Sequence, residues 1–179
     1  MAVRVVVSGY SRVGKSPMIG ILQDLISEAG KTSRRIWAGQ WVIAQAGWSM
    51  TDQSWRQDPA SRDLLRSVMK KTFDAGDWSV PSEYMQADMA SAPADVYFLD
   101  GIRNPFDLVK ILRPGDTILL LPIPEGCAAI DSFEEQGVDA VRAIAKFAQS
   151  QFGLKVVQVE REGELFTPEN LRKYAAFLQ

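Results

Sequence analysis

The chain has 179 residues, 46% of them hydrophobic and 23% charged, which is typical of one folded globular domain and excludes a disordered chain. It contains no histidine, which excludes Ser-His-Asp triads, histidine metal ligands and imidazole general bases. The formal net charge of −2 gives no electrostatic argument for a nucleic-acid-binding surface.

The first predicted element is a buried strand over the β-branched run from Val3 to Val7. The spacing G-x-x-x-x-G-K-S follows it, and an apolar helical pattern then continues to about Gly30. The order of strand, glycine-rich loop and helix predicts a phosphate-binding P-loop. Its nucleotide-binding residues are expected to be Gly9, Tyr10, Ser11, Arg12, Val13, Gly14, Lys15, Ser16 and Pro17.

This loop has the chemistry of a nucleotide site, because inward-facing backbone N–H groups and a helix N-terminus bind phosphate oxygens. Lys15 is expected to reach the outer phosphates of ATP, and Ser16 to offer its hydroxyl to Mg²⁺. Pro17 fits the first helical turn, where its missing N–H has no helical partner. ATP and Mg²⁺ are therefore the predicted cofactors, and the alternative is a Gly-Lys-Ser loop that occurs by chance.

Residues 31–60 form a tryptophan-rich insert, expected on the substrate side. It begins with a short predicted strand, Thr32 to Trp37. Its aromatic and basic residues are Trp37, Trp41, Trp48, Trp55, Arg34, Arg35 and Arg56. Tryptophans beside arginines can stack on a base, and the alternative is that they pack a small cap over the core.

Apolar periodicity and breaker residues predict the other elements. In chain order these are a helix over 61–73, a helix over 81–89, a strand over 95–99, a helix over 104–112, a strand over 117–121, a lid-like loop over 122–136, a helix over 138–148, a strand over 154–159 and a closing helix capped by Thr167. Strands alternating with helices predict an α/β chain with the three-layer P-loop NTPase fold: a five-stranded parallel sheet with helices on both faces. Residues 1–179 are expected to form a single domain.

A second group of candidate residues follows the predicted strand 95–99. Asp100 stands where a Walker-B carboxylate holds Mg²⁺, directly or through water. Gly101 permits close approach of a ligand, and Arg103 is placed to meet a phosphate through two hydrogen bonds. Because the carboxyl ends of parallel strands share one edge, this group is expected beside the glycine-rich loop; the alternative is an ordinary turn.

These motifs resemble the nucleoside monophosphate kinases, adenylate kinase most visibly. The family's Asp-Gly-Phe-Pro-Arg is similar to residues 100–103, its Gly-Asp-x-Leu-Arg to 61–66 and its Gly-x-x-Val-Pro turn to 76–81. The Ser-Arg-Asp-Leu-Leu run also resembles phage-type deoxynucleoside monophosphate kinases. The resemblance, which covers residues 3–30 and 60–122, implies that Arg62, Arg66 and Arg103 bind the acceptor's phosphate, and the alternative for each is a solvated surface arginine. Arg142, in the following amphipathic helix, is a candidate lid arginine or an exposed structural arginine.

The sequence therefore predicts an ATP-dependent kinase that phosphorylates a (deoxy)nucleoside monophosphate, with Lys15, Asp100 and Arg103 in catalysis. Residues 122–136 contain no basic residue, which favours a second hypothesis. This is a kinase of the same fold acting on a hydroxyl, either of a small metabolite or of a hydroxymethylpyrimidine in phage DNA, although the pI of about 5.3 speaks against DNA. A third hypothesis is a nucleotide-switched binding protein.

One cysteine, Cys127, cannot form an intrachain disulfide and is compatible with a reducing cytosol. No stretch is long and apolar enough to span a bilayer. We therefore expect a cytoplasmic monomer or homodimer that binds a nucleotide or nucleotide-like acceptor, with modified DNA as an alternative partner and no membrane.

Overall fold

A five-stranded parallel sheet organises the computed structural model, which describes residues 2–10, 12–48, 59–77, 79–102, 104–123, 129, 132–160, 166–176 and 178. The sheet order is β2-β3-β1-β4-β5. Its strands are β1 (Val3–Ser8), β2 (Ser33–Trp37), β3 (Val96–Asp100), β4 (Thr117–Leu120) and β5 (Lys155–Gln158). The prediction of an α/β chain with a five-stranded parallel sheet is confirmed.

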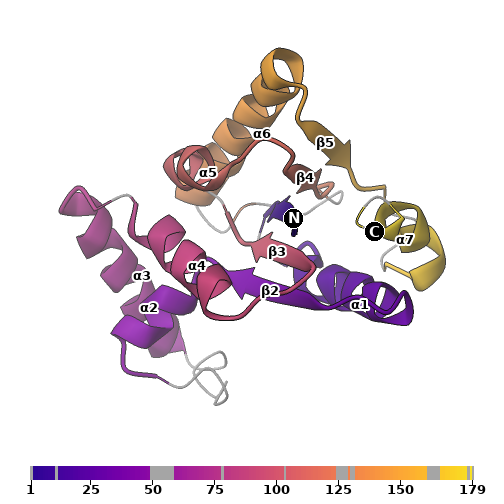
Figure 1. Cartoon of the computed structure of the whole chain (residues 1–179). Helices are drawn as coiled ribbons and strands as arrows, with labels where there is room; N and C mark the ends of the chain where they lie inside the picture. Colours follow the sequence, from indigo (N-terminus) through magenta and orange to yellow (C-terminus); the bar gives the residue numbers. More distant parts are fainter. Residues whose placement is uncertain are drawn as a thin grey trace.

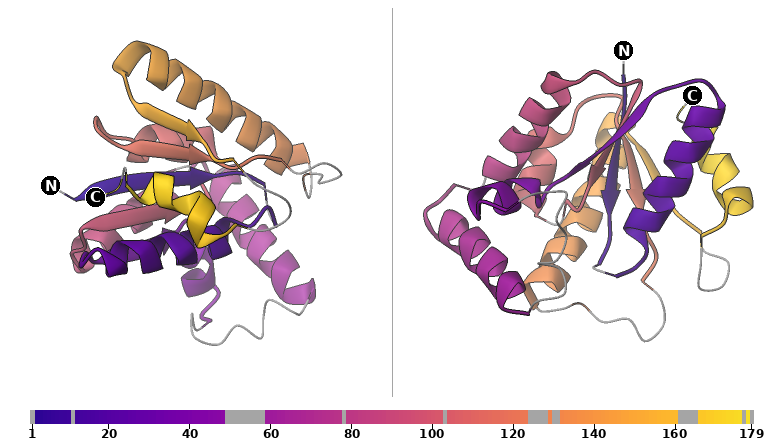
Figure 2. Two further views of the ribbon diagram at one scale, coloured as in Figure 1. Left: turned by 90° about the vertical axis from the view of Figure 1, so that its right-hand side faces the viewer. Right: turned by 90° about the horizontal axis from the view of Figure 1, so that it is seen from below.

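Helices cover both faces of this sheet (Figure 1). They are α1 (Lys15–Glu28), α2 (Gln40–Gln45), α3 (Pro59–Asp74), α4 (Val80–Ser91), α5 (Pro105–Ile111), α6 (Ser132–Phe152) and α7 (Pro168–Ala175). The helical part of the hydrophobic core on one face comes from α1 and α7, together with Val138 of α6, and that of the core on the other face comes from α4, α5 and the rest of α6. α2 and α3 pack against each other beside the sheet, as the second view of Figure 2 shows.

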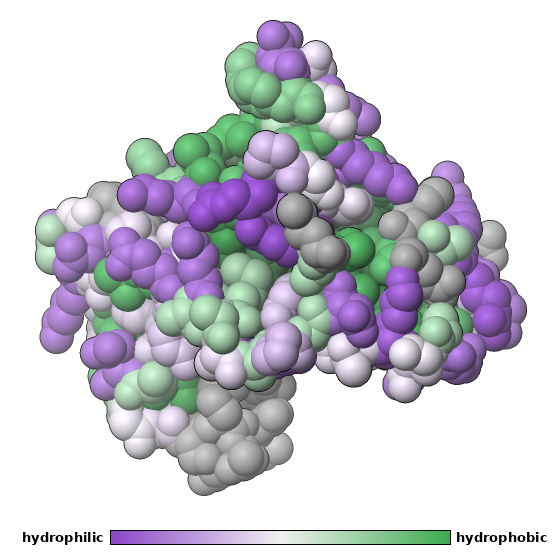
Figure 3. Space-filling view, viewed as in Figure 1, coloured by the Kyte–Doolittle hydropathy of each residue, from purple (hydrophilic) through white to green (hydrophobic). Residues whose placement is uncertain are grey.

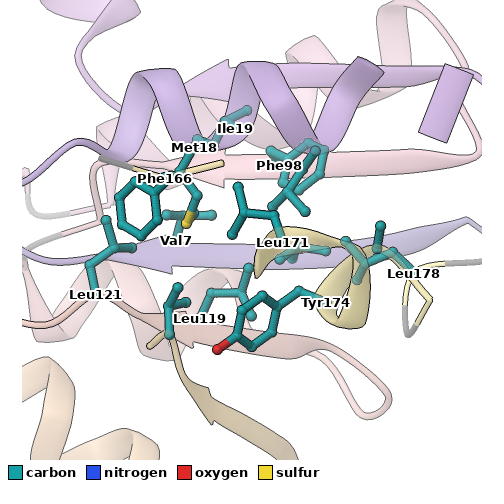
Figure 4. Close-up of a cluster of buried hydrophobic side chains, with 14 of the residues drawn as sticks. Val7, Met18, Ile19, Phe98, Leu119, Leu121, Phe166, Leu171, Tyr174 and Leu178 are labelled. Atoms are coloured by element: carbon teal, nitrogen blue, oxygen red, sulfur yellow. The ribbon is translucent and has the colours of Figure 1, made fainter. Parts of the chain in front are cut away.

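The central strand β1 is buried on both faces, which explains its run of valines. Val5 and Val7 belong to the core on the α1 face, and Val6 belongs to the opposite core. Figure 4 shows the core on the α1 face, where side chains of α1 and α7 meet those of β1, β3 and β4. The alternation of side chains along each strand therefore decides which helix layer a residue contacts.

The connection from β1 to β2 moves across the sheet in the direction opposite to the other connections between strands. Because crossovers between parallel strands are right-handed, this reversal places α1 on one face and α4, α5 and α6 on the other. The neighbouring strands β1 and β3 thus send their following loops toward opposite faces. In open α/β sheets, ligands bind at the carboxyl ends of strands where the strand order reverses in this way.

Two helices differ from the sequence prediction. α2 is additional, and it buries Trp41, Val42 and Ile43; a six-residue helix is too short for its periodicity to be recognised. α6 begins at Ser132, inside the stretch 122–136 that was predicted to be loop. Its first turn contains Glu134 and Glu135, which suit a helix N-terminus but add nothing to an apolar pattern.

Hydrophilic and hydrophobic residues are interspersed on the face seen in Figure 3. The large hydrophobic side chains that are exposed are Leu64, Phe106, Val109, Ile123, Phe147 and Phe152. Searching the part of the chain that the structure describes reveals no helix of the length and apolarity needed to cross a membrane.

Replacing Phe98 by alanine should lower the free energy of unfolding by about 3–5 kcal/mol, because its fully buried ring lies between β3 and α1. Urea denaturation measures this loss. Phe152→Ala is the matched control, since that side chain is 74% exposed, and it should cost no more than about 1 kcal/mol. Equal losses in the two variants would contradict the placement of the core.

Candidate functional site

The loop from residue 9 to residue 14, called the glycine loop below, joins β1 to α1 at the carboxyl edge of the sheet. Gly14 is the N-cap of α1 with φ of 89°, a left-handed conformation that favours glycine. A Cβ atom at this position would lie 3.0 Å from Cε2 of Phe166, the residue that precedes the N-cap of α7. The loop conformation therefore depends on a missing side chain and on an aromatic ring from the far end of the chain.

Lys15 lies at the first helical position of α1, and its side chain turns back into the glycine loop. Its Nζ donates hydrogen bonds to the carbonyl oxygen of Gly9, at 2.8 Å, and to that of Tyr10. The residue is only 7% exposed. A buried ammonium and the positive end of the α1 dipole thus lie together, an arrangement that attracts an anion.

Asp100 ends β3 on the same face of the sheet as α1, and it is 2% exposed. Arg35 of β2 donates to its Oδ2 from Nε, at 2.8 Å, and also from Nη2. The same Nη2 donates to the hydroxyl oxygen of Ser16 at 2.8 Å. One guanidinium therefore joins the two residues for which the sequence predicted a role in binding Mg²⁺.

The other carboxylate oxygen of Asp100, Oδ1, is buried and has no hydrogen-bond partner among the described residues. A buried carboxylate oxygen without a partner is costly unless a cation, a proton donor or water reaches it. Hard divalent cations prefer such oxygen ligands. The donor set of Asp100 and Ser16 therefore fits Mg²⁺.

The turn after β3 is held close to β1 and β2. Ser8 donates from its hydroxyl to the carbonyl oxygen of Ile102 at 2.8 Å, and the N–H of Gly101 donates to the carbonyl oxygen of Val7 at 3.3 Å. Gly101 has φ of 81°, and a Cβ atom there would lie 3.0 Å from both Cδ1 and Nε1 of Trp37. An indole ring thus lies against the backbone immediately beside Asp100.

Of the other predicted substrate residues, Arg66 is not brought to this edge by any contact that the structure describes, whereas Arg142 reaches the edge through Leu121, whose Cβ would lie 3.1 Å from a Cβ atom at Gly9. Arg66 is exposed on α3 and forms an ion pair with Asp63 at 3.4 Å. Arg142 on α6 donates from Nη2 to the carbonyl oxygen of Leu121 at 2.8 Å, just beyond β4.

The structure describes most of the other predicted nucleotide-binding residues, but several predicted residues lie outside the part of the chain that it describes. Arg12 is exposed with φ of 64°, Pro17 is exposed, and Tyr10 and Val13 are buried. The positions outside the described residues are Ser11, Trp55, Arg56, Trp78, Cys127 and Arg103, together with the side chain of Arg62.

Sequence reasoning missed Arg35 as a member of this site. The alternation of side chains between the two faces of β2 could have indicated its position. Ile36 is buried in the core on the opposite face, so Arg35 and Trp37 share the α1 face. The partner of Arg35 could not be foreseen, because β2 pairs with β3, a strand that comes much later in the chain.

A second buried polar group lies where α5 meets α4. Burial raises the pKa of Asp107 to about 7, and a hydrogen bond from the backbone N–H of Ser82 acts in the opposite direction. Its Oδ1 and the Nδ2 of Asn104, the N-cap of α5, both lack partners among the described residues. Burial therefore favours the protonated form of Asp107 up to about neutral pH.

No protein-family model matches the chain. The chain is similar to DNA-directed RNA polymerase β subunits of Streptococcus agalactiae serotypes Ia and V, each 24% identical over 148 residues that cover 73% of this chain. The chain spans only 12% of the length of these relatives. A similarity this low and this partial does not assign the chain to a family.

Replacing Gly101 by alanine should destabilise the protein more than the same change at Gly115, by about 1 kcal/mol or more. Both glycines have positive φ, but a Cβ atom at Gly115 would meet nothing within 4 Å, whereas at Gly101 it would press on Trp37. Urea denaturation compares the stabilities, and tryptophan emission should shift only in Gly101→Ala. Identical behaviour of the two variants would contradict the packing of Trp37 on this turn.

Asp107 should make stability fall as the pH rises from about 4 to 7. Its pKa is higher in the folded state, about 7, than the ordinary value of 3.8, so the native protein binds more protons than the unfolded chain within this window. Asp107→Asn should lose this contribution, whose slope is at most about 1.4 kcal/mol per pH unit. Denaturation across this pH range tests the prediction, with the exposed Asp139→Asn as the control; parallel curves for wild type and Asp107→Asn would contradict it.

Proposed function

We propose that this chain has the three-layer P-loop NTPase fold and transfers the γ-phosphate of ATP to a nucleotide-type acceptor, a (deoxy)nucleoside monophosphate. The observation that carries the proposal is the meeting of Lys15, Ser16 and Asp100 at one sheet edge, where a buried ammonium and a helix N-terminus lie near a buried carboxylate. These are the groups needed to bind a polyphosphate together with a cation.

Ser16 and Asp100 are the residues that would hold Mg²⁺. In the part of the chain that the structure describes, no three acidic or cysteine side chains gather as a self-contained metal site. Phosphate oxygens and water would therefore complete the coordination, as is usual for Mg²⁺. When bound, the ion offsets negative charge on the β- and γ-phosphates.

In the proposed reaction, an acceptor oxygen attacks the γ-phosphorus in line. The new P–O bond forms as the bond to the oxygen bridging the β- and γ-phosphates breaks, and ADP leaves with that oxygen. Lys15 stabilises charge on the phosphoryl oxygens, and Arg103, which directly follows the turn at residues 101–102, is assigned to the transferring phosphate and the acceptor. A phosphate acceptor is already ionised, so the reaction needs no histidine base.

A hydroxyl acceptor is the second candidate, and the contacts of two predicted substrate arginines favour it. Arg66 is engaged by Asp63 on the exposed surface of α3, and Arg142 is engaged by the carbonyl of Leu121. A metabolite or hydroxymethylpyrimidine that presents a hydroxyl needs fewer arginines than a nucleoside monophosphate. Such an acceptor would require a carboxylate near its proton.

Lys15→Ala should reduce ADP formation from Mg-ATP by about a hundredfold or more, because it removes the cation nearest the phosphates. The assay measures ADP release with a panel of ribo- and deoxynucleoside monophosphates and with DNA with or without hydroxymethyluracil. Lys146→Ala, an exposed lysine on α6, is the control and should retain full activity.

The panel separates the candidates. ADP release that depends on one monophosphate would support the first candidate, and release that depends only on modified DNA would support the second. Full activity of Lys15→Ala would overturn the assignment of the glycine loop. Nucleotide binding without ADP release from any acceptor would instead point to a nucleotide-switched binding protein.

A further inference from the structure

Arg35 bridges Ser16 and Asp100, the two residues that would hold Mg²⁺ in the proposed function. Its Nη2 contacts both the Oγ of Ser16 and the Oδ2 of Asp100, and its Nε lies 2.8 Å from the same Oδ2. An arginine is always protonated and has no acceptor, so it can only act as a cation here. The contacts are those of a positive charge held by two oxygen ligands.

The pairing of β2 with β3 places the Arg35 side chain in this position. β2 pairs with β3 so that Ile36 is opposite Leu99, and both lie in the core on the α4–α6 face. The residues on either side of this pair therefore face α1, which places the side chains of Arg35 and Asp100 on one face. α1 supplies Ser16 to that face from its first turn.

From these contacts we propose that Arg35 is the positioning residue of the cation site and competes with the metal for it. The guanidinium holds Ser16 and Asp100 together when no metal is bound, and it must leave the Oγ of Ser16 before Mg²⁺ binds there with a nucleotide. This inference rests on the proposed function, because it assumes that the glycine loop binds a nucleotide with Mg²⁺.

Two physical facts support the proposal that Arg35 and Mg²⁺ replace each other at this site and do not occupy it together. A guanidinium on Oδ2 of Asp100 and a divalent cation on Oδ1 of the same carboxylate repel each other strongly, because Asp100 is only 2% exposed and water screens the charges poorly there, and both would need the Oγ of Ser16. The Arg35 side chain is 30% exposed and reaches the surface, so it can move away without unfolding its strand.

Arg34 provides a matched control on the same strand. Its side chain is also 30% exposed and also pairs with an aspartate, Asp88, at 3.0 Å. It additionally donates to the carbonyl oxygens of Asp88 and Ala92 at 3.0 and 2.8 Å, at the C-terminal end of α4. Replacing either arginine removes one charge and one ion pair from β2, but only Arg35 contacts the candidate cation ligands.

The experiment measures the affinity for the non-hydrolysable analogue β,γ-imido-ATP by calorimetry, in Mg²⁺ and in EDTA, for wild type, Arg35→Met, Arg34→Met and Lys15→Ala. The quantity compared is the ratio of the dissociation constant in EDTA to that in Mg²⁺. Arg35→Met should raise this ratio about tenfold or more, because the metal no longer displaces a cation and Asp100 is unpaired without it. Arg34→Met should leave the ratio at the wild-type value.

A ratio that is unchanged or lower in Arg35→Met would overturn the inference, since Arg35 would then be neutral or would assist the metal. The proposed function fails separately: it falls if wild type does not bind the analogue, or if Lys15→Ala binds it as well as wild type.

A second measurement uses the wild-type protein, in case Arg35→Met does not fold. The ¹⁵Nε–¹Hε signal of Arg35 should be protected in the free protein and should shift and exchange faster when the analogue binds with Mg²⁺, but not when it binds in EDTA. The Arg34 signal should stay constant in all conditions. An Arg35 signal that does not respond to Mg²⁺ would overturn the inference.

Discussion

The ion pair between Asp100 and Arg35 offsets the cost of removing a carboxylate almost wholly from water, and the carboxyl edge of this sheet is arranged around that pair. Asp100 is 2% exposed at the end of a strand buried along its whole length. Arg35 provides the charge from the neighbouring strand and extends the contact to Ser16 on α1. The ion pair therefore links β2, β3 and the helix that follows the glycine loop.

The topology makes this meeting possible. Ser16 and Arg35 are brought to Asp100 because β3 lies between β1 and β2, although it follows both in the chain. The single reversal in crossover direction places α1 above this group while α4, α5 and α6 fill the other face. Two hydrogen bonds, one to the carbonyl oxygen of Val7 and one from the hydroxyl of Ser8, then hold the turn after Asp100 against the end of β1 and fix the spacing between the ends of β1 and β3.

Much of the fold could be predicted from the sequence, because its strands and longer helices have strong periodic patterns. β1, the glycine loop and α1 are local in sequence, and valines, glycines and an apolar stripe each identify their own structure. α2 and the start of α6 were not predicted, because one is too short to show a period and the other begins with acidic residues.

The candidate site could also be predicted only in part. Lys15, Ser16 and Asp100 could be proposed from local motifs and from the rule that parallel strands end at one edge. The role of Arg35 could not, because a strand arginine shows its partner only when the strand order is known. Arg66 and Arg142 are the opposite case: a resemblance suggested a ligand for each, and the structure describes a contact with the protein itself for each.

The packing of Phe166 on Gly14 joins the two most distant parts of the site in sequence. During synthesis, the glycine loop emerges before four of the five strands, but the ring that packs on it emerges only after all five. The shape of the loop therefore depends on a contact of high sequence separation, and the loop-closure entropy of the intervening chain opposes that contact. A nascent chain lacking this segment has the motif for binding phosphate without the ring that supports its backbone.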